Sequence, residues 1–434
     1  MINSPQKDYY IDYYGVNLFN YAMQNKKRSK SIDVIIITVI LTLLAACFVI
    51  SKPIFANSDV EIIKQSDTGK EIYLEKNFKE NIKNKYAGAY INFPSAGIAH
   101  IKKTKYINSK PIKINIVELN TNVNPNLKIK PQIASLKLNA KTTVRKIAQK
   151  ENSLAAINGS FFKPQTGVPL GALMINKEVM TGPIYNRVGI AIFEENNQTS
   201  FKMLNIDFDI SAITPNFKIK IDNINQPRML STHLLMYTSL WGKISPPPPQ
   251  NGYNMVIRDK KPIKISANPV EISEGDIVLQ GSKEIISKLG KENSILTNIK
   301  LQDEIKDAVH IIGAGPYLVK NSEVYVDYKE QKLQAISGKN PRSAVGFKKD
   351  GTFIIVTIDG REQKSVGMTL FELAKFMKSI GCEYAMNFDG GSSSAMYVKG
   401  SIVNDAVNKE GIAVSNALVI NEIDSSNIKI SSLN

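Results

Sequence analysis

The densest group of reactive side chains lies near the C-terminal end of the chain, at residues 387–394. An apolar segment stops at Asp389, turns through two glycines and continues into three serines. A carboxylate can act as a base or a nucleophile, and glycine lets a ligand approach the backbone closely because it has no Cβ. The same pattern is also typical of a polar hairpin turn, so this stretch alone leaves both interpretations open.

Polar residues border three other apolar segments. Asn158 follows one of them, Arg342 begins a second, and Asp359 follows a third, with Arg361 two positions later. Arginine presents a planar fork of donors that suits phosphate or carboxylate, so the two arginines indicate an anionic ligand. The pair Asn158-Gly159 alone is equally typical of a turn.

A strand, a helix and a second strand are expected to position the two carboxylates. Residues 352–358 are β-branched and aromatic, which predicts a strand that ends at Asp359. A capping box at residues 369–372 begins a helix with an apolar stripe, and the helix leads into the strand before Asp389. If the two strands run parallel, both carboxylates lie at the same edge of a sheet, where such sheets bind ligands.

The rest of the folded body is expected to be rich in strands. Helices are predicted at residues 142–150 and 281–289. Strands are predicted at residues 112–117, 154–157, 188–193, 201–210, 254–257 and 276–279. The fold class is therefore α+β: a mixed, β-rich single catalytic domain with a few helices, over residues 111–421.

The N-terminal part has the sequence pattern of a targeting signal. Residues 34–50 are apolar and uncharged, and at about 1.5 Å per residue they cover roughly 26 Å, which spans a membrane only with flanking residues included. Basic residues at 26–30 favour a cytoplasmic N-terminus. We expect a cytoplasmic tail at 1–31, an uncleaved transmembrane signal-anchor helix at 32–51, and a single-pass protein of the cell membrane with an extracytoplasmic C-terminal domain. A signal peptide cleaved near residues 54–56 is the alternative.

Two further segments flank the body. Residues 52–110 are rich in Lys, Asn and Ser, which predicts a juxtamembrane stalk with a short helix around residues 71–85. Residues 422–434 are expected to form a C-terminal tail.

Composition limits the class of partner. The net charge of +16 is compatible with attraction to anionic membrane or wall polymers, although solvated lysine faces give the same charge. Nucleic acid is not expected, because no zinc-ligand spacing, arginine-rich arm or aromatic-basic sheet signature is present. Cys47 and Cys382 lie in very different contexts, which argues against a disulfide and excludes a cysteine zinc site. His100, His233 and His310 have no partner at ligand spacing, so we expect structural or surface roles.

Six short blocks together resemble the phosphodiester glycosidase family, with its uncovering-enzyme-like domain and bacterial exopolysaccharide-related members. In chain order they are Asn-Gly-Ser-Phe-Phe at 158–162, Gly-Ala-Gly-Pro at 313–316, Pro-Arg-Ser-Ala-Val-Gly at 341–346, Asp-Gly-Arg at 359–361, Ser-Val-Gly-Met-Thr-Leu at 365–370 and Asn-Phe-Asp-Gly-Gly-Ser at 387–392. The resemblance implies a hydrolase that cleaves the sugar C1–O bond of a sugar-1-phosphate diester.

The resemblance also implies roles for individual residues. Glycosidic cleavage passes through an oxocarbenium-like state that needs a carboxylate nearby, so Asp389 is expected to be the nucleophile or base and Asp359 the second carboxylate. Arg342 and Arg361 are expected to hold the phosphate. The other expected substrate-binding residues are Asn158, Gly159, Asn387, Gly390, Gly391, Ser392, Ser393 and Ser394. No cofactor is expected, and the sequence leaves a metal requirement open.

Two departures from the family pattern keep other functions open. Ser160 and Ser392 stand where the family usually has glycine, which places side chains where substrate would approach the backbone. A non-catalytic protein of the same fold that binds cell wall or exopolysaccharide is therefore the alternative. A hydrolase with a nucleophile among serines 392–394 is a weaker one, because the Gly-x-Ser-x-Gly elbow is missing and no histidine is linked to a motif.

The sequence therefore predicts a membrane-anchored, extracytoplasmic phosphodiester glycosidase of cell-wall or exopolysaccharide metabolism. Its expected partner is a phosphate-linked sugar or an anionic glycopolymer. The sugar, the group beyond the phosphate and the oligomeric state stay open.

Overall fold

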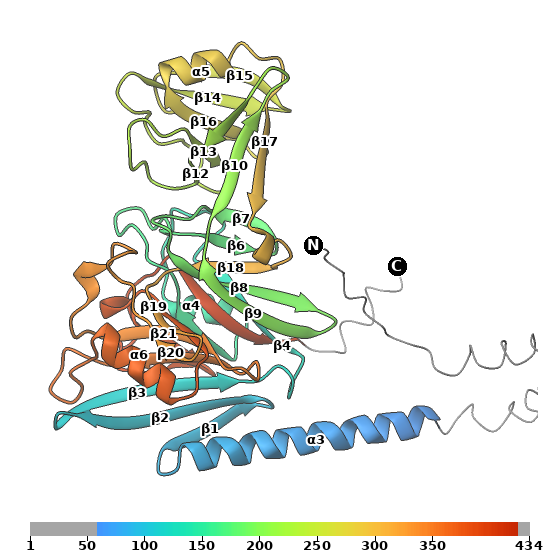
Figure 1. The fold of residues 1–434 in the computed structure, drawn as a ribbon, viewed down its shortest axis with the longest axis vertical. Coiled ribbons are helices and arrows are strands. Elements are labelled where there is room, and N and C mark those ends of the chain that lie inside the picture. Colours follow the sequence, from blue (N-terminus) through green and yellow to red (C-terminus); the bar gives the residue numbers. More distant parts are fainter. Residues whose placement is uncertain (1–58, 424–434) are drawn as a thin grey trace, which may run out of the picture. The chain divides into compact units, whose positions relative to one another are not determined.

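The computed structural model describes residues 59–423 of the 434-residue chain (Figure 1). The chain divides into two units, Met1–Ile72 and Tyr73–Asn434, and all described strands belong to the second. The expected anchor at 32–51 lies outside the described residues. Within residues 59–423, no helix is both long enough and apolar enough to cross a membrane. The α-helices of this range are α3 (Asp59–Lys85), α4 (Val144–Lys150), α5 (Lys283–Leu289) and α6 (Leu370–Ser379).

The largest sheet has eight strands, each antiparallel to its neighbours. In spatial order they are β1 (Tyr90–Ser95), β2 (Ile98–Ile107), β3 (Lys110–Leu119), β22 (Phe353–Ile358), β21 (Arg342–Phe347), β23 (Tyr384–Asn387), β19 (Tyr317–Lys320) and β20 (Glu323–Val324). β21 and β22 are buried along their whole length, which explains their continuous apolar sequence.

The two faces of this sheet pack against different layers. Because successive side chains of a strand point to opposite faces, Val117 and Ile355 enter one core while Ile116 and Ile354 enter another. The first core lies against two further sheets, and the second lies against α6. The sheet is therefore covered on both sides.

Two five-stranded antiparallel sheets share the first core. One consists of β25 (Ser401–Ile402), β24 (Met396–Val398), β5 (Ala155–Asn158), β26 (Asn416–Glu422) and β4 (Leu127–Ile133). The other consists of β7 (Glu178–Thr181), β6 (Leu173–Ile175), β18 (His310–Gly313), β8 (Val188–Glu195) and β9 (Gln198–Asn205). α4 packs through Val144, Ile147 and Ala148 into a separate, smaller core that includes residues of β5 and β26.

Residues 208–301 form an inserted module between β9 and β18. Its three-stranded sheet contains β11 (Lys218–Ile221), β10 (Phe208–Ile213) and β17 (Leu296–Leu301). Its five-stranded sheet contains β12 (Asn223–Ile224), β13 (Leu235–Thr238), β16 (Ile277–Ser282), β14 (Gly252–Arg258) and β15 (Lys261–Ser266). β10 and β17 are antiparallel neighbours that carry the chain into and out of the module (Figure 1).

The β-rich fold with few helices is confirmed. The capping box is also confirmed: the Glu372 amide donates to Thr369 Oγ1 at 3.2 Å, and the Thr369 amide donates to Glu372 Oε2 at 2.8 Å. The single strand expected at 201–210 is instead β9 and β10, which belong to different sheets. The strand pairing is interrupted at Asp207, whose amide donates to Gln302 Oε1 at 3.0 Å.

The expected stalk at 52–110 is wrong for residues 90–107, which form β1 and β2 of the eight-stranded sheet. The first half of β2 is buried and apolar, and its lysines at 102, 103 and 105 lie in the more exposed half. Because those lysines dominate the composition of the segment, its strand character was not recognised from the sequence.

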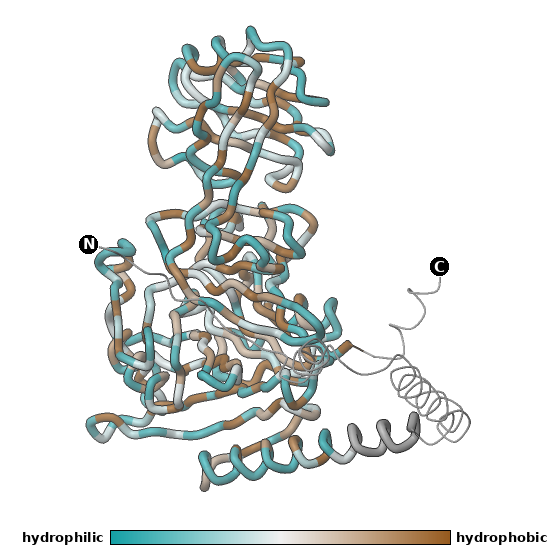
Figure 2. Tube along the Cα trace, turned by 45° about the vertical axis from the view of Figure 1, so that its right-hand side comes forward, coloured by the Kyte–Doolittle hydropathy of each residue, from teal (hydrophilic) through white to brown (hydrophobic). Residues whose placement is uncertain are grey.

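The described part of α3 is mostly hydrophilic (Figure 2). Only Phe78, Ile82 and neighbouring Tyr86 enter the core on the α6 side.

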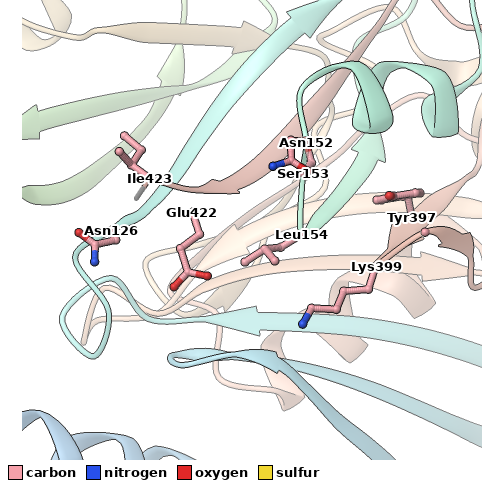
Figure 3. A pocket seen from close by; sticks show the side chains of 9 residues that line it. Asn126, Asn152, Ser153, Leu154, Tyr397, Lys399, Glu422 and Ile423 are labelled. Atoms are coloured by element: carbon pink, nitrogen blue, oxygen red, sulfur yellow. The ribbon is translucent and has the colours of Figure 1, made fainter. Parts of the chain in front are cut away.

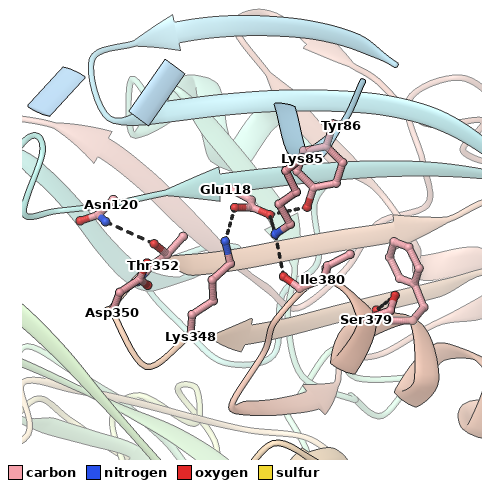
Figure 4. Close-up of polar contacts among 10 residues, drawn as sticks. Lys85, Tyr86, Glu118, Asn120, Lys348, Asp350, Thr352, Ser379 and Ile380 are labelled. Atoms are coloured by element: carbon pink, nitrogen blue, oxygen red, sulfur yellow. Dashed lines mark hydrogen bonds and ion pairs between the residues drawn. The ribbon is translucent and has the colours of Figure 1, made fainter. Parts of the chain in front are cut away.

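A buried carboxylate attaches the end of α3 to the sheet (Figure 4). Glu118 on β3 accepts from Lys85 Nζ at 2.6 Å, from Lys348 Nζ at 2.6 Å and from the Tyr86 hydroxyl. Lys85 also donates to the Ile380 carbonyl at 2.6 Å. Burial lowers the pKa of Lys85 to about 8, against the opposing effect of Glu118.

Replacing Glu118 by Gln should destabilise the fold by roughly 3 kcal/mol, because it leaves two partly buried lysines facing a neutral group. Chemical unfolding of the full-length protein measures this. The matched change Glu410→Gln removes the exposed ion pair with Arg145 and should cost about 1 kcal/mol or less. Equal losses in the two variants would contradict the role of the buried cluster.

Candidate active site at the edge of the eight-stranded sheet

The two expected carboxylates lie at one edge of the eight-stranded sheet. β22 and β23 are both antiparallel to β21, which lies between them, so they run in the same direction and Asp359 and Asp389 follow their ends. Arg342 begins β21 opposite Ile358, at the same edge. The expected common edge is confirmed, with an intervening antiparallel strand that the sequence did not predict.

The backbone of Asp389 is fixed by the strand end that carries Asn158. The Asp389 amide donates to the Gly159 carbonyl at 3.1 Å, and the Asp389 carbonyl accepts from Asn158 Nδ2 at 2.6 Å. After Asp389 the chain forms a short 3-10 turn (Gly391–Ser393), where the Gly391 amide donates to the Pro341 carbonyl at 2.8 Å. Gly391 has a φ of +60°, a left-handed backbone conformation that glycine adopts more easily than other residues because it has no Cβ.

Asn158 has a positioning role. Its side chain is fully buried, and Oδ1 accepts from Ser343 Oγ at 2.7 Å and from the Ala395 amide at 3.1 Å. Since both ends of the amide bind protein groups, the expectation that Asn158 contacts substrate is wrong for this structure.

The side chain of Asp389 faces a pocket of about 460 Å³. The lining residues are Lys141, Phe161, Phe162, Pro164, Asp389, Ser393, Ile412 and Ala413. Burial raises the pKa of Asp389 to about 6, although the Ser393 side chain and the Gly390 backbone favour the charged form. A carboxylate with this pKa is suited to proton transfer near neutral pH.

Asp359 lines a different pocket, of about 560 Å³, with the lysines at 102, 103 and 113. Its Oδ1 accepts from the Asp405 amide at 3.0 Å. Burial and the Asp405 carboxylate raise its pKa to about 6. The expectation that Asp359 is the second carboxylate of the Asp389 site is therefore not met: the two strand ends share an edge, but side chains of β2 and β3 enclose Asp359 separately.

Arg342 is only 1% exposed and stabilises a loop. Its Nε donates to the Met368 carbonyl at 2.9 Å, and its Nη2 donates to the carbonyls of Ile336, at 2.7 Å, and Gly338. These contacts do not fit the expected phosphate-binding role, because the arginine fork is directed at backbone carbonyls.

Arg361 remains at the surface. Its Nη2 donates to Asn340 Oδ1 at 2.9 Å, and its Nη1 donates to Ser392 Oγ at 3.3 Å. A Cβ at Gly391 would lie 3.1 Å from the same guanidinium, so glycine makes room for it. The Arg361 fork is thus partly occupied by Asn340 and Ser392, and its expected role in phosphate binding stays a prediction.

Several other expected contacts are buried. Asn387 is fully buried and donates to the carbonyls of Gly315, at 3.0 Å, and Phe388, at 2.6 Å. Ser394 is also buried, and a Cβ at Gly159 would overlap with Asn416. The structure therefore gives a supporting role beneath the pocket surface to Asn387, Ser394 and Gly159. Ser393 lines the pocket, and Gly390 is half-buried.

The serine at 160, where the family usually has glycine, does not face the Asp389 pocket. Ser160 is buried, and its hydroxyl accepts from Asn416 Nδ2 at 2.8 Å. This departure therefore leaves the pocket open.

Sequence reasoning missed most of the pocket wall. Phe161 and Phe162 belong to the first block but carried no assigned role, and aromatic rings beside a polar turn were the available signal. Lys141, Ile412 and Ala413 come from segments with no recognisable motif.

Another pocket, of about 590 Å³, contains none of the expected site residues (Figure 3). Its carboxylate, Glu422, accepts from Ser95 Oγ at 2.7 Å and from Asn124 Nδ2 at 2.8 Å. Glu422 therefore connects segments of the fold.

The histidines and acidic side chains between residues 59 and 423 do not gather into a metal site. No cluster of three or more His, Cys, Asp or Glu side chains in this range could hold a metal ion. Burial lowers the pKa of both His100 and His310 to about 4, and His310 accepts from the Asn176 amide at 3.1 Å. These two histidines are structural, as expected.

The sequence comparisons agree with the family predicted from the six blocks. Residues 250–421 match the family model described as phosphodiester glycosidase, and this range holds five of the six blocks. The resemblance to the phosphodiester glycosidase family is confirmed. The block at 158–162 lies outside the matched range but contacts Asp389 in the structure.

Relatives of the phosphodiester glycosidase domain cover limited parts of the chain. The SPbeta prophage-derived uncharacterized protein YomE of Bacillus subtilis (strain 168) is 38% identical over 119 residues, which are 27% of this chain and 18% of that protein. The N-acetylglucosamine-1-phosphodiester alpha-N-acetylglucosaminidase of Mus musculus is 22% identical over 130 residues, 26% of this chain and 25% of that protein. The matches thus span a quarter or less of these relatives.

A crystal structure of a hypothetical protein from Synechocystis has the same fold. Its TM-score is 0.69 at 21% identity, over 76% of this chain and 63% of that one.

The raised pKa of Asp389 predicts a pH-dependent stability. Because the folded pKa, about 6, exceeds the ordinary 3.8, the folded state holds its proton more tightly, and stability contributed by this group falls as pH rises from about 4 to 6. Asp389→Asn should therefore be more stable than wild type above pH 6, by roughly 2 kcal/mol for a half-buried group, with the difference vanishing below pH 4.

Urea unfolding between pH 3.5 and 8 measures this difference. Asp209→Asn, which removes an exposed carboxyl paired with Lys218, serves as the control and should change the free energy of unfolding by about 1 kcal/mol or less. A constant difference between wild type and Asp389→Asn across this range would contradict the burial of the Asp389 carboxyl.

Proposed function

We propose that the chain is a hydrolase that cleaves the sugar C1–O bond of a sugar-1-phosphate diester. The observation that carries the proposal is Asp389, which belongs to a family block, lines a pocket of about 460 Å³ and has its pKa raised to about 6. The aromatic rings of Phe161 and Phe162 form a wall against which a sugar face can pack.

In the proposed reaction, Asp389 takes a proton from a water molecule whose oxygen forms the new bond to C1. The C1–O bond to phosphate breaks, and its electron pair moves to the phosphate oxygen. The leaving phosphomonoester is stable as an anion, so the reaction needs cationic stabilisation of phosphate more than a strong general acid. This is consistent with a pocket that Asp389 lines without Asp359.

The proposed location is the outer face of the cell membrane, with residues 32–51 as a single-pass anchor and a role in cell-wall or exopolysaccharide metabolism. The basic residues at 26–30 and the net charge of +16 support this proposal, since a cationic surface attracts anionic glycopolymers.

The second candidate is a binding protein of the same fold. It is favoured by the placement of Asp359 and Asp389 in different pockets, because most glycosidases place a pair of carboxylates around one bond.

The decisive experiment incubates the full-length protein in detergent with a panel of hexosamine and hexose 1-phosphate diesters, with and without chelator. Equimolar free sugar and phosphomonoester are expected. Asp389→Asn should lower turnover by about 100-fold or more, and wild-type turnover should decline below pH 6 as the carboxylate takes up a proton.

Asp359→Asn is the matched control, since it changes a similarly perturbed carboxyl in the other pocket and should leave turnover within about three-fold, well below the effect of a lost acid-base group. Sugar release that survives Asp389→Asn would remove this residue from the mechanism. Saturable glycopolymer binding without any product would favour the binding protein.

A further inference from the structure

Arg187 is a buried cation without a carboxylate partner. It is 8% exposed, and its Nε donates to the Gln331 carbonyl at 3.4 Å. In the part of the chain that the structure describes, the arginines in ion pairs are Arg145 and Arg258, and none of these pairs includes Arg187. Burial without a counter-charge is unfavourable and lowers the pKa of Arg187 to about 10. An anionic ligand would remove this imbalance.

Two aromatic rings hold the guanidinium group. Its central carbon lies 5.1 Å from the centre of the Phe161 ring and 5.3 Å from that of Tyr185. These are attractive cation–π distances. Phe161 also lines the pocket of Asp389, so the ring that contacts Arg187 belongs to the wall of the candidate active site.

The turn before Arg187 adopts an uncommon conformation. Tyr185 and Asn186 have φ angles of 54° and 50°, and the Arg187 amide closes the turn by donating to the Ile184 carbonyl at 3.1 Å. Left-handed backbone is unfavourable for a bulky residue such as tyrosine, and residues held this way cluster at functional sites. The turn fixes Arg187 beside Phe161.

The terminal nitrogens of Arg187 are not used by the fold. Among the described residues, neither Nη1 nor Nη2 takes part in a hydrogen bond, and neither belongs to the fully enclosed side-chain atoms that lack a partner. Each nitrogen therefore keeps some exposed surface and an unused donor, whereas the fork of Arg342 is directed at backbone carbonyls and that of Arg361 at Asn340 and Ser392. A fork with both terminal nitrogens available matches two oxygens of a phosphate.

We propose that Arg187 binds the phosphate group of the substrate at the Phe161 side of the Asp389 pocket and holds the phosphomonoester as it leaves. The identity of the ligand rests on the proposed function. When the C1–O bond breaks, the added negative charge develops on the phosphate oxygen, which a guanidinium fork stabilises directly.

Binding of inorganic phosphate to the full-length protein tests this inference independently of turnover. Titration calorimetry should show saturable binding to wild type, weakened about 10- to 100-fold in Arg187→Gln, the range expected for lost charge-assisted bonds. Arg187→Lys keeps the charge without the fork and should bind with intermediate affinity. Arg145→Gln, which removes an exposed cation from an ion pair with Glu410, is the control and should bind like wild type.

Kinetics on an accepted diester give a second readout. Arg187→Gln should raise KM, lower kcat and lose product inhibition by phosphomonoester. Arg187→Lys, which keeps the positive charge, should restore part of this activity. If Arg187 had only a structural role, the lysine variant would not restore it. Thermal unfolding verifies that each variant is folded. If Arg187→Gln does not fold, the phosphate affinity and kinetics of Arg187→Lys are compared with wild type instead.

The outcomes separate the two proposals. Unchanged phosphate affinity in a folded Arg187→Gln protein overturns this inference, whether or not the wild type is active. Phosphate binding that depends on Arg187, in a protein that releases no sugar, supports the anion site and overturns the hydrolase proposal.

Discussion

One buried amide determines where the candidate catalytic carboxylate lies. The Asn158 side chain binds the Asp389 carbonyl, the Ser343 hydroxyl and the Ala395 amide, and so joins β5, β21 and the loop after β23. Because an unsatisfied buried amide is costly, these groups hold one another in a single arrangement. This explains how blocks more than two hundred residues apart in sequence form one site.

The features that sequence predicts well are those encoded locally. Strand ends at Asp359 and Asp389 follow from apolar runs that stop at carboxylates, and the start of α6 follows from Thr369 and its capping box. The pocket that each carboxylate faces could not be predicted, because it depends on segments distant in sequence, such as Lys102 on β2 for one and Ile412 for the other. β2 itself was missed because exposed lysines dominate its composition.

The arginines also show that the sequence does not determine which side chains face a ligand. Motif position identifies Arg342 and Arg361 as candidates for anion binding, yet tertiary contacts direct Arg342 at backbone carbonyls. Arg187 has no motif, and what distinguishes it is burial, the absence of an ion-pair partner in the described range and its contact with Phe161. Residue type and spacing therefore indicate the chemistry of a site, while packing decides which side chains perform it.

The inserted module leaves and rejoins the body through adjacent strands, with Phe208 opposite Leu301. The insertion does not change the connectivity of the body, because the chain could be closed across this point without rearranging the body's sheets. It does change which body residues are buried, since Ala172, Met174 and Ala191 of the body share a core with the module. Evolution can thus exchange this module for another only if the replacement also shields those apolar side chains, so the junction constrains variation more than the connectivity does.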